Sequence, residues 1–466
     1  MSFNPCLKSS FSLALKALSK FSSIILIPIN FKIICKGYNT QKVLDEEVKE
    51  IRKNIIKDKN ILYFDYTASG QAYKPIEKEI LTILKTYANT HSEVATSAVK
   101  TSEHYAKARS DLKEALAIDE RFYVLPCGTG ATGAIKKFQE LMGIYIPPRT
   151  LKRFTCKPSS IPVVFIGPYE HHSNELSFRE GLCDVVRIPL DMNENIDFEY
   201  LEKELQKAQG REIIASFSVA SNVTGILSDY RRLYTLIKAY GGTLCLDAAA
   251  ASPYINIDCN YYDALFLSPH KLLGGVGSCG LLVIKKELCT EAKPTFAGGG
   301  TVAYVSRTSH NFLSDFETVE DAGTPAILQF IRASLAYNLR NEIGLDKIHE
   351  KEEELKFYFG SRVRSIEGVK LYCKYSQEKL PIFSLNFEGV SPYAISKYLS
   401  EQYGIQTRAG CSCAGPYGHD LLELEDGQSF SEKPGWLRVS IHYTHTKKEI
   451  DILLKALQEA LRALRK

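Results

Sequence analysis

The ends of two predicted strands carry side chains that could do chemistry together. The apolar run 243–247 ends in Asp247, and the next apolar run is followed by Ser268, His270 and Lys271. A single lysine after a strand is usually a solvated turn residue. Here the lysine is accompanied by a carboxylate that can keep a pyridine nitrogen protonated and by short polar groups that can bind phosphate. Because a lysine amine forms a Schiff base with an aldehyde, this set predicts a site for pyridoxal phosphate.

A glycine-rich loop predicts a phosphate cradle. Residues 122–127 form an expected strand, and Gly128, Gly130 and Gly133 lead into a helix whose free amides can bind an anion. The glycines match G-x-G-x-x-G, but the region where the dinucleotide fingerprint requires an acid, 147–153, contains none. The P-loop sequence Gly-Lys-Ser/Thr does not follow either. The loop therefore favours a phosphate ligand other than a dinucleotide.

Two further strand ends carry His171-His172 and Asn222. Adjacent residues of a strand point to opposite faces, so the two histidines are not expected to share a metal ion. A single imidazole stacked on a flat pyridine ring is the more plausible arrangement, and an ordinary core or surface histidine pair is the alternative. We predict no metal site.

Short apolar runs alternate with amphipathic segments over the first two thirds of the chain. This alternation is typical of a mostly parallel sheet with helices on both faces. Strands are expected at 61–65, 122–127, 162–166, 213–219, 243–247, 265–267 and 281–284, and helices at 43–56, 75–87 and 101–117.

The last third predicts a different, smaller α+β unit. A long helical region over 325–363 is followed by expected strands at 382–387 and 437–441, helices at 392–403 and from about 447, and a polar loop at 407–416. We therefore predict an α/β protein with a leader at 1–44, a large cofactor-binding domain at 45–325 and a small C-terminal domain at 326–466.

Composition favours an ordinary globular protein with no electrostatic affinity for nucleic acid. Residues 1–44 hold six lysines and no acid, so the remainder has 52 basic against 54 acidic residues. No apolar run reaches the roughly 20 residues that span a bilayer, so we expect no membrane segment. The leader predicts either a targeting peptide, for example mitochondrial, or a disordered extension, and hence a soluble protein of the cytoplasm or an organellar matrix. The 12 cysteines are scattered, which favours mostly buried, reduced thiols.

Taken together, the residues at these strand ends, the Ser-x-His-Lys sequence and the downstream Arg408-x-Gly-x-x-Cys413 resemble the class V aminotransferase family of fold-type I pyridoxal-phosphate enzymes. The resemblance extends from about Leu62 to Asp451 and is strongest to cysteine desulfurases and selenocysteine lyases. It implies a homodimer with shared active sites.

The resemblance also implies roles for individual residues. Lys271 would be the Schiff-base lysine, Asp247 the partner of the pyridine nitrogen, and His171 a ring-stacking residue that also moves protons. Arg438, with Arg408 nearby, would bind the substrate carboxylate, for which a guanidinium fork is well shaped. Further cofactor contacts would come from Ala131, Thr132, Ser268, His270 and Asn222, the last also close to the substrate, while Thr324 would reach the phosphate of a neighbouring subunit.

Cys413 occupies the position of the nucleophile in the desulfurases. There the thiolate attacks the sulfur of bound cysteine, which leaves alanine and an enzyme persulfide, and a sulfur-acceptor protein is a further expected partner. Such a thiolate needs an accessible loop near positive charge, which Arg408 could supply. Two ordinary thiols in a turn, Cys411 and Cys413, are the alternative, and a zinc site fits no common spacing.

Three departures from the family pattern leave the substrate open. Ala250 replaces a glutamine that donates to the phenol oxygen of the cofactor, Cys411 replaces a histidine, and residues 417–435 form a polar, acid-bearing insertion. The alternatives are a lyase, epimerase or aminotransferase acting on another small amino acid, and a catalytically degenerate scaffold or sulfur-relay protein. Because both Lys271 and Asp247 are present, the scaffold is the less favoured of these.

Overall fold

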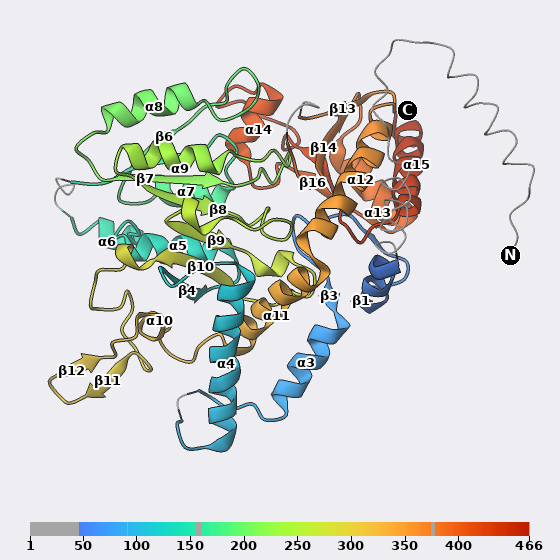
Figure 1. Cartoon of the computed structure of the whole chain (residues 1–466). Helices are drawn as coiled ribbons and strands as arrows, with labels where there is room; N and C mark the ends of the chain where they lie inside the picture. Colours follow the sequence, from blue (N-terminus) through green and yellow to red (C-terminus); the bar gives the residue numbers. More distant parts are fainter. Residues whose placement is uncertain (1–45, 91, 155–159, 374–377, 466) are drawn as a thin grey trace, which may run out of the picture. The chain divides into compact units, whose positions relative to one another are not determined.

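The computed structural model describes residues 46–90, 92–154, 160–373 and 378–465 (Figure 1). The described residues from Glu50 onward belong to one compact unit. The leader predicted at 1–44 lies outside the described residues. Within the described part, residues 46–54 are helical, in agreement with most of the helix expected there. None of the described helices is long and apolar enough to cross a membrane.

A seven-stranded sheet forms the larger core and confirms the predicted α/β class. β10 is the one antiparallel strand of this sheet, since it pairs antiparallel with both of its neighbours while the other pairs are parallel. The remaining six strands therefore end at the same edge. In spatial order the strands are β4 (Phe122–Cys127), β10 (Gly280–Lys285), β9 (Ala264–Leu267), β8 (Thr243–Asp247), β7 (Ile213–Ser218), β5 (Val163–Ile166) and β6 (Asp184–Arg187).

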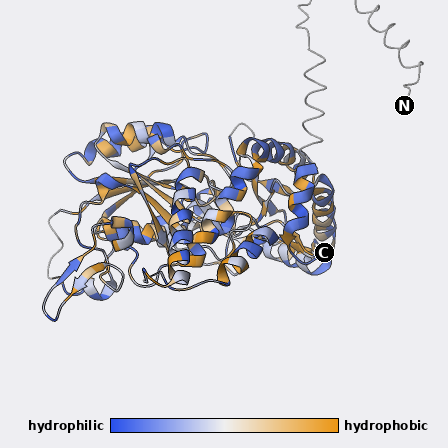
Figure 2. Cartoon of the chain, turned by 60° about the horizontal axis from the view of Figure 1, so that its bottom comes forward, coloured by the Kyte–Doolittle hydropathy of each residue, from blue (hydrophilic) through white to orange (hydrophobic). Residues whose placement is uncertain are grey.

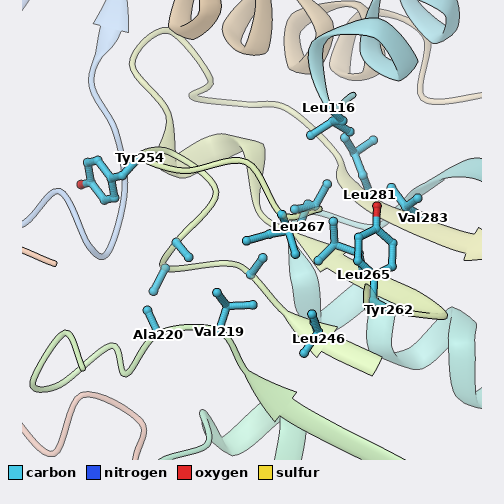
Figure 3. Packing of buried hydrophobic residues seen from close by; sticks show 14 of the residues in the cluster. Leu116, Val219, Ala220, Leu246, Tyr254, Tyr262, Leu265, Leu267, Leu281 and Val283 are labelled. Carbon is cyan, nitrogen blue, oxygen red and sulfur yellow. The ribbon is translucent and has the colours of Figure 1, made fainter. Parts of the chain in front are cut away.

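Both faces of this sheet are buried, which explains its uninterrupted apolar runs. Along β8, Leu244 and Leu246 pack into one hydrophobic cluster while Cys245 packs into the cluster on the opposite face. Figure 3 shows leucines of β8, β9 and β10 packed together with Leu116 and Tyr262. The apolar colouring in Figure 2 is correspondingly concentrated on the strands.

Helices flank this sheet (Figure 1). Those with strong amphipathic patterns, such as α9, bury one stripe against the strands and leave the other side polar. The helices of this part are α3 (Lys74–Leu84), α4 (Thr96–Ala115), α5 (Ala131–Leu141), α6 (Pro148–Leu151), α7 (His172–Arg179), α8 (Phe198–Lys207), α9 (Tyr230–Ala239), α10 (Phe316–Val319) and α11 (Ile327–Ile343).

A second, antiparallel sheet of four strands carries the C-terminal part of the chain. β2 (Leu62–Tyr63) pairs in parallel with β15 (Ile405–Gln406) in a separate two-stranded sheet. The strands in order are β13 (Val369–Leu371), β14 (Ile382–Phe387), β17 (Trp436–Ser440) and β16 (Arg408–Gly410), accompanied by α12 (Leu345–Val363), α13 (Pro392–Tyr403), α14 (Gly415–Leu422) and α15 (Lys447–Leu464).

Several predicted elements differ in the structure. The region expected as one helix over 325–363 is two helices, α11 and α12, because Gly344 lies between them with φ of +93°, a conformation that favours glycine and ends a helix. α4 begins at Thr96, earlier than expected. Two short pairs of strands were not predicted, namely β1 (Ile55–Ile56) with β3 (Ala72–Tyr73), and β11 (Val302–Val305) with β12 (His310–Phe312).

Candidate active site

A cavity of about 280 Å³ lies at the edge of the large sheet where the parallel strands end. Eleven of the twelve predicted site residues line it, drawn from both sheets. They are Ala131, Thr132, His171, Asn222, Asp247, Ser268, His270, Lys271, Arg408, Cys413 and Arg438.

Thr324 is the predicted residue that does not line the cavity of its own chain; its hydroxyl accepts a hydrogen bond from Asn89 Nδ2 at 2.9 Å. That Thr324 reaches the cofactor phosphate of a neighbouring subunit stays a prediction.

The N-terminus of α5 forms one end of the cavity. Gly130 caps the helix, and the Ala131 amide donates to Ser268 Oγ at 2.8 Å. A Cβ on Gly130 would lie 3.2 Å from Ser268 Oγ and 3.3 Å from His270 Nε2, so glycine allows both side chains to approach the helix end. The Thr132 hydroxyl is hydrogen-bonded to Ser173 Oγ at 2.7 Å. Amides of a first helical turn, hydroxyls and an imidazole are the donors that a phosphate needs.

Asp247 and Lys271 lie at neighbouring strand ends, and burial disfavours the charge of each, which shifts their pKa values in opposite directions. Burial raises the pKa of Asp247, partly opposed by the hydrogen bond from the Ala249 amide at 2.9 Å and by Lys271. Burial lowers the pKa of Lys271 to about 8, against the attraction of Asp247. A lysine with such a pKa has an appreciable fraction of free amine near neutral pH, which is what attack on an aldehyde requires.

The two histidines do not lie on a strand, as the sequence argument assumed, but begin α7. His171 caps the helix, and its Nδ1 accepts from the Ser173 amide at 3.1 Å. Burial, with help from the Lys271 charge, lowers the pKa of His171 to about 4, so the imidazole is neutral at pH 7 and able to accept a proton. His172 instead forms hydrogen bonds with the Cys413 loop.

Arg438 is buried, and its guanidinium is shared between two partners. Nη2 donates to Asp65 Oδ1 at 2.7 Å and Nη1 to the Asn222 carbonyl at 3.0 Å. Arg408 lies on the other side of the same carboxylate, 3.9 Å from Asp65 Oδ2. Asp65 was missing from the predicted site, although it stands at the end of an expected strand exactly as Asp247 does.

Cys413 reaches the cavity from a strained turn. Ser412 and Cys413 both have left-handed backbones, with φ of +53° and +58°, and the Ala414 amide closes the turn onto the Cys411 carbonyl at 3.0 Å. Each such non-glycine residue costs about 1 kcal/mol or more, so the surrounding contacts must hold the conformation.

Four hydrogen bonds from distant parts of the chain hold this turn, and we call them the clasp. The Cys413 carbonyl accepts from the His172 amide at 2.7 Å, and the Gly415 amide donates to His172 Nε2 at 2.8 Å. Asn222 Nδ2 donates to the Ser412 carbonyl at 2.7 Å, and Trp436 Nε1 to Ser412 Oγ at 3.1 Å. Sequence reasoning missed His172 and Trp436, because nothing in their local pattern indicates a partner so far along the chain.

A buried carboxyl group lies beneath the site. Glu170 accepts hydrogen bonds from the Ser218 hydroxyl at 2.6 Å, the Ser218 amide at 2.9 Å and Asn174 Nδ2 at 2.7 Å. Burial nevertheless raises its pKa to about 7, and the nearby Asp247 charge adds to that effect.

The match to known proteins identifies the family. The family model for the class V aminotransferases matches residues 62–453, most of the chain. The chain belongs to the aminotransferase class V family. Curated relatives include probable cysteine desulfurases of Staphylococcus aureus and Staphylococcus epidermidis, which are 25% and 24% identical over 416 residues that cover 87% of this chain and 93% of the relative.

Solved structures show the same fold for this class V chain. An apo cysteine desulfurase from Thermococcus onnurineus has a TM-score of 0.76 at 23% identity, covering 89% of this chain and 98% of that one. The cysteine desulfurase CsdA of Escherichia coli has a TM-score of 0.72 at 21% identity, covering 90% and 99%.

The cavity of this class V chain fits the pyridoxal phosphate on which the family depends. It offers phosphate donors at one end, a buried carboxylate and an amine at the strand ends, and an imidazole between them. Two buried polar atoms of its wall, Asn222 Oδ1 and Arg438 Nε, have no hydrogen-bond partner among the described residues, so each remains available to a ligand. Within the same residues no group of three or more histidine, cysteine or acidic side chains is placed to hold a metal ion.

Proposed function

We propose that this protein is a pyridoxal-phosphate-dependent cysteine desulfurase, which converts L-cysteine to alanine and carries the sulfur as a persulfide on Cys413. The observation that carries the proposal is the position of Cys413. Its turn projects into the wall of a cavity that also contains Lys271, Asp247 and two arginines. An aminotransferase or epimerase needs no thiol there, whereas transfer of the substrate sulfur to an enzyme persulfide does.

The cofactor would bind with its phosphate at the N-terminus of α5, its pyridine nitrogen at Asp247 and its aldehyde at Lys271. When bound, it supplies an electron sink that stabilises negative charge on the substrate Cα. Asp247 would keep the ring nitrogen protonated, and the neutral His171 would stack on the ring and move protons. The Lys271 amine, whose neutral form burial favours, would hold the aldehyde group and would be available to accept the Cα proton.

The arginines orient the substrate. Arg438 Nε has no partner among the described residues, and together with the exposed edge of Arg408 it can receive the substrate carboxylate. This directs the substrate side chain toward the Cys413 turn. The thiolate of Cys413 then attacks the substrate sulfur; the new S–S bond forms as the C–S bond breaks, the electron pair stays on carbon, and a proton completes alanine.

Further parts of the proposal concern assembly. We propose that the protein is a homodimer in which Thr324 contributes to the phosphate site of the neighbouring subunit, and that a sulfur-acceptor protein collects the product sulfur.

The test is the full-length protein loaded with pyridoxal phosphate and given L-cysteine and a reductant, with sulfide and alanine measured together. We expect equal amounts of the two products from the wild type. C413S should keep the visible absorbance of the bound cofactor and release no sulfide. C183S is the matched control, because Cys183 is likewise half-buried but lies outside the cavity. Sulfide release by C413S at the wild-type rate would falsify the assignment.

A further inference from the structure

Cys411 and Cys413 lie in one turn, and only one of the two lines the cavity. Cys413 lines the cavity, whereas Cys411 does not, although it is also half-buried rather than enclosed. Cys411 directly follows β16 and accepts, through its carbonyl, the hydrogen bond that closes the turn. One residue therefore contributes to the cavity wall, while its neighbour two positions earlier does not.

Tyr393 and Glu432 belong to the surroundings of Cys411. A Cβ on Gly410, the residue before Cys411, would lie 3.2 Å from Tyr393 Oη, so Tyr393 packs against this end of the turn. Burial raises the pKa of Tyr393, and the charges of Cys411 and Glu432 raise it further. Glu432 also accepts from the Ser391 hydroxyl at 2.6 Å, which attaches the exposed segment 425–433 to the start of α13. Cys411 thus lies next to the polar insertion that the sequence places beside the nucleophile.

We propose that Cys411 is a second sulfur-carrying residue, which takes the sulfane sulfur from Cys413 and presents it outside the cavity. The inference deepens the proposed desulfurase function and depends on it.

Chain geometry brings the two sulfurs within reach. Consecutive Cα atoms are about 3.8 Å apart, so the Cα atoms of residues 411 and 413 are at most about 7.5 Å apart. A persulfide extends Cys413 by a further S–S bond of about 2 Å. The strained conformation of the turn gives its central residues a lower-energy alternative, so the Cys413 side chain can leave the cavity wall once the clasp opens.

The transfer is balanced without an external oxidant or reductant. The Cys411 thiolate attacks the terminal sulfur of the Cys413 persulfide; a new S–S bond forms at Cys411 as the S–S bond at Cys413 breaks. Cys413 leaves as a thiolate and takes up the proton that Cys411 gave up. Cys413 is then free to remove sulfur from a second cysteine.

The consequence is a stoichiometry that intact-mass spectrometry can measure. The full-length holoenzyme is incubated with excess L-cysteine in the absence of reductant. We expect two added sulfur atoms per chain in the wild type and in C183S, one in C411S, and none in C413S. Retention of the bound cofactor's absorbance in C411S shows that this variant is folded, and C411H, which restores the residue common in the family, should also carry one.

The possible failures are distinct. No added sulfur in the wild type overturns the proposed function itself. One sulfur in both the wild type and C411S overturns the relay and leaves the desulfurase standing, and so does a second sulfur in C411S. Loss of two hydrogens without added sulfur, seen in the wild type and absent from C411S, also overturns the relay, because Cys411 would then displace sulfide and form a disulfide.

Discussion

The two halves of the cavity are built in different ways. At the cofactor half, Asp247, Ser268 and the N-terminus of α5 follow directly from strands whose pairing fixes their positions. At the nucleophile half, Cys413 sits in a strained turn that four long-range hydrogen bonds hold in place. Backbone pairing within the sheet positions the first half, whereas individual hydrogen bonds between distant segments position the second.

This difference corresponds to different tasks. A cofactor that stays bound throughout the reaction needs fixed donors, for which strand ends and helix termini are well suited. A thiol that must first attack inside the cavity and then deliver sulfur outside it needs two positions. A turn with stored strain and a small number of clasp contacts provides them. Substitutions in the cofactor half should therefore abolish cofactor binding and activity together. Substitutions in the clasp should lower activity and leave cofactor binding unchanged.

The largest effect is expected from K271A. Without the amine, the cofactor aldehyde has no covalent partner, so we expect loss of the visible absorbance of the bound cofactor and a fall in turnover of at least ~10³-fold. The measurement is an absorbance spectrum after reconstitution, with sulfide release assayed alongside it. K271R keeps the charge but not the nucleophile and should fail in the same way; full activity in either variant would contradict the assignment of Lys271.

A smaller and more selective effect is expected from H172L. The leucine cannot accept from the Gly415 amide, so the turn loses one contact of the clasp and Cys413 is misplaced. We expect turnover to fall by about 10- to 100-fold while cofactor absorbance and binding of L-alanine stay unchanged.

The conservative variant H172Q supplies the matched control, because its amide oxygen can accept the same hydrogen bond. It should recover part of the lost turnover. Equal losses of cofactor binding and turnover in H172L would mean that the two halves are not separable in the way described.

The smallest effect on turnover, within a few-fold, is expected from E170Q, which should alter the pH dependence of stability. Because burial raises the pKa of Glu170 to about 7, protonation of Glu170 stabilises the folded state. This contribution to the free energy of unfolding is complete below the unfolded pKa near 4.5 and is lost as the pH rises to 7. The wild type should lose on the order of 3 kcal/mol of unfolding free energy over this range from this group alone. E170Q should lack that loss, as measured by urea unfolding at pH 5 and pH 8. Parallel pH profiles for the two proteins would rule out a raised pKa at Glu170.

Much of the fold and of the cofactor half could be predicted from local sequence. An apolar run buried on both faces, such as 243–247, specifies a central strand, and a carboxylate at its end is delivered to the edge where parallel strands finish. The glycine-rich loop before α5 could be predicted equally locally, from Gly128, Gly130 and Gly133 placed between an apolar run and a helix.

The region predicted to be helical over 325–363 is helical in the structure, but it is divided at one residue. Gly344 looks like a tolerated helix residue in a periodic pattern, but its positive φ divides the segment into α11 and α12.

The burial expected for most of the cysteines was only partly right: four of the nine described free cysteines are buried, and five are half-buried.

The sequence by itself determined which residues would hold a phosphate, a pyridine nitrogen and an aldehyde. Strand ends and helix starts can be predicted locally, because apolar residues repeat regularly within an element and glycine, proline or capping residues mark its ends. Only the tertiary structure decided that Asp65 shares Arg438 with the substrate site, that His172 holds the Cys413 turn, and that Cys411 lies outside the cavity. These contacts join segments hundreds of residues apart. Their geometry depends on how the two sheets pack, and no local pattern encodes that.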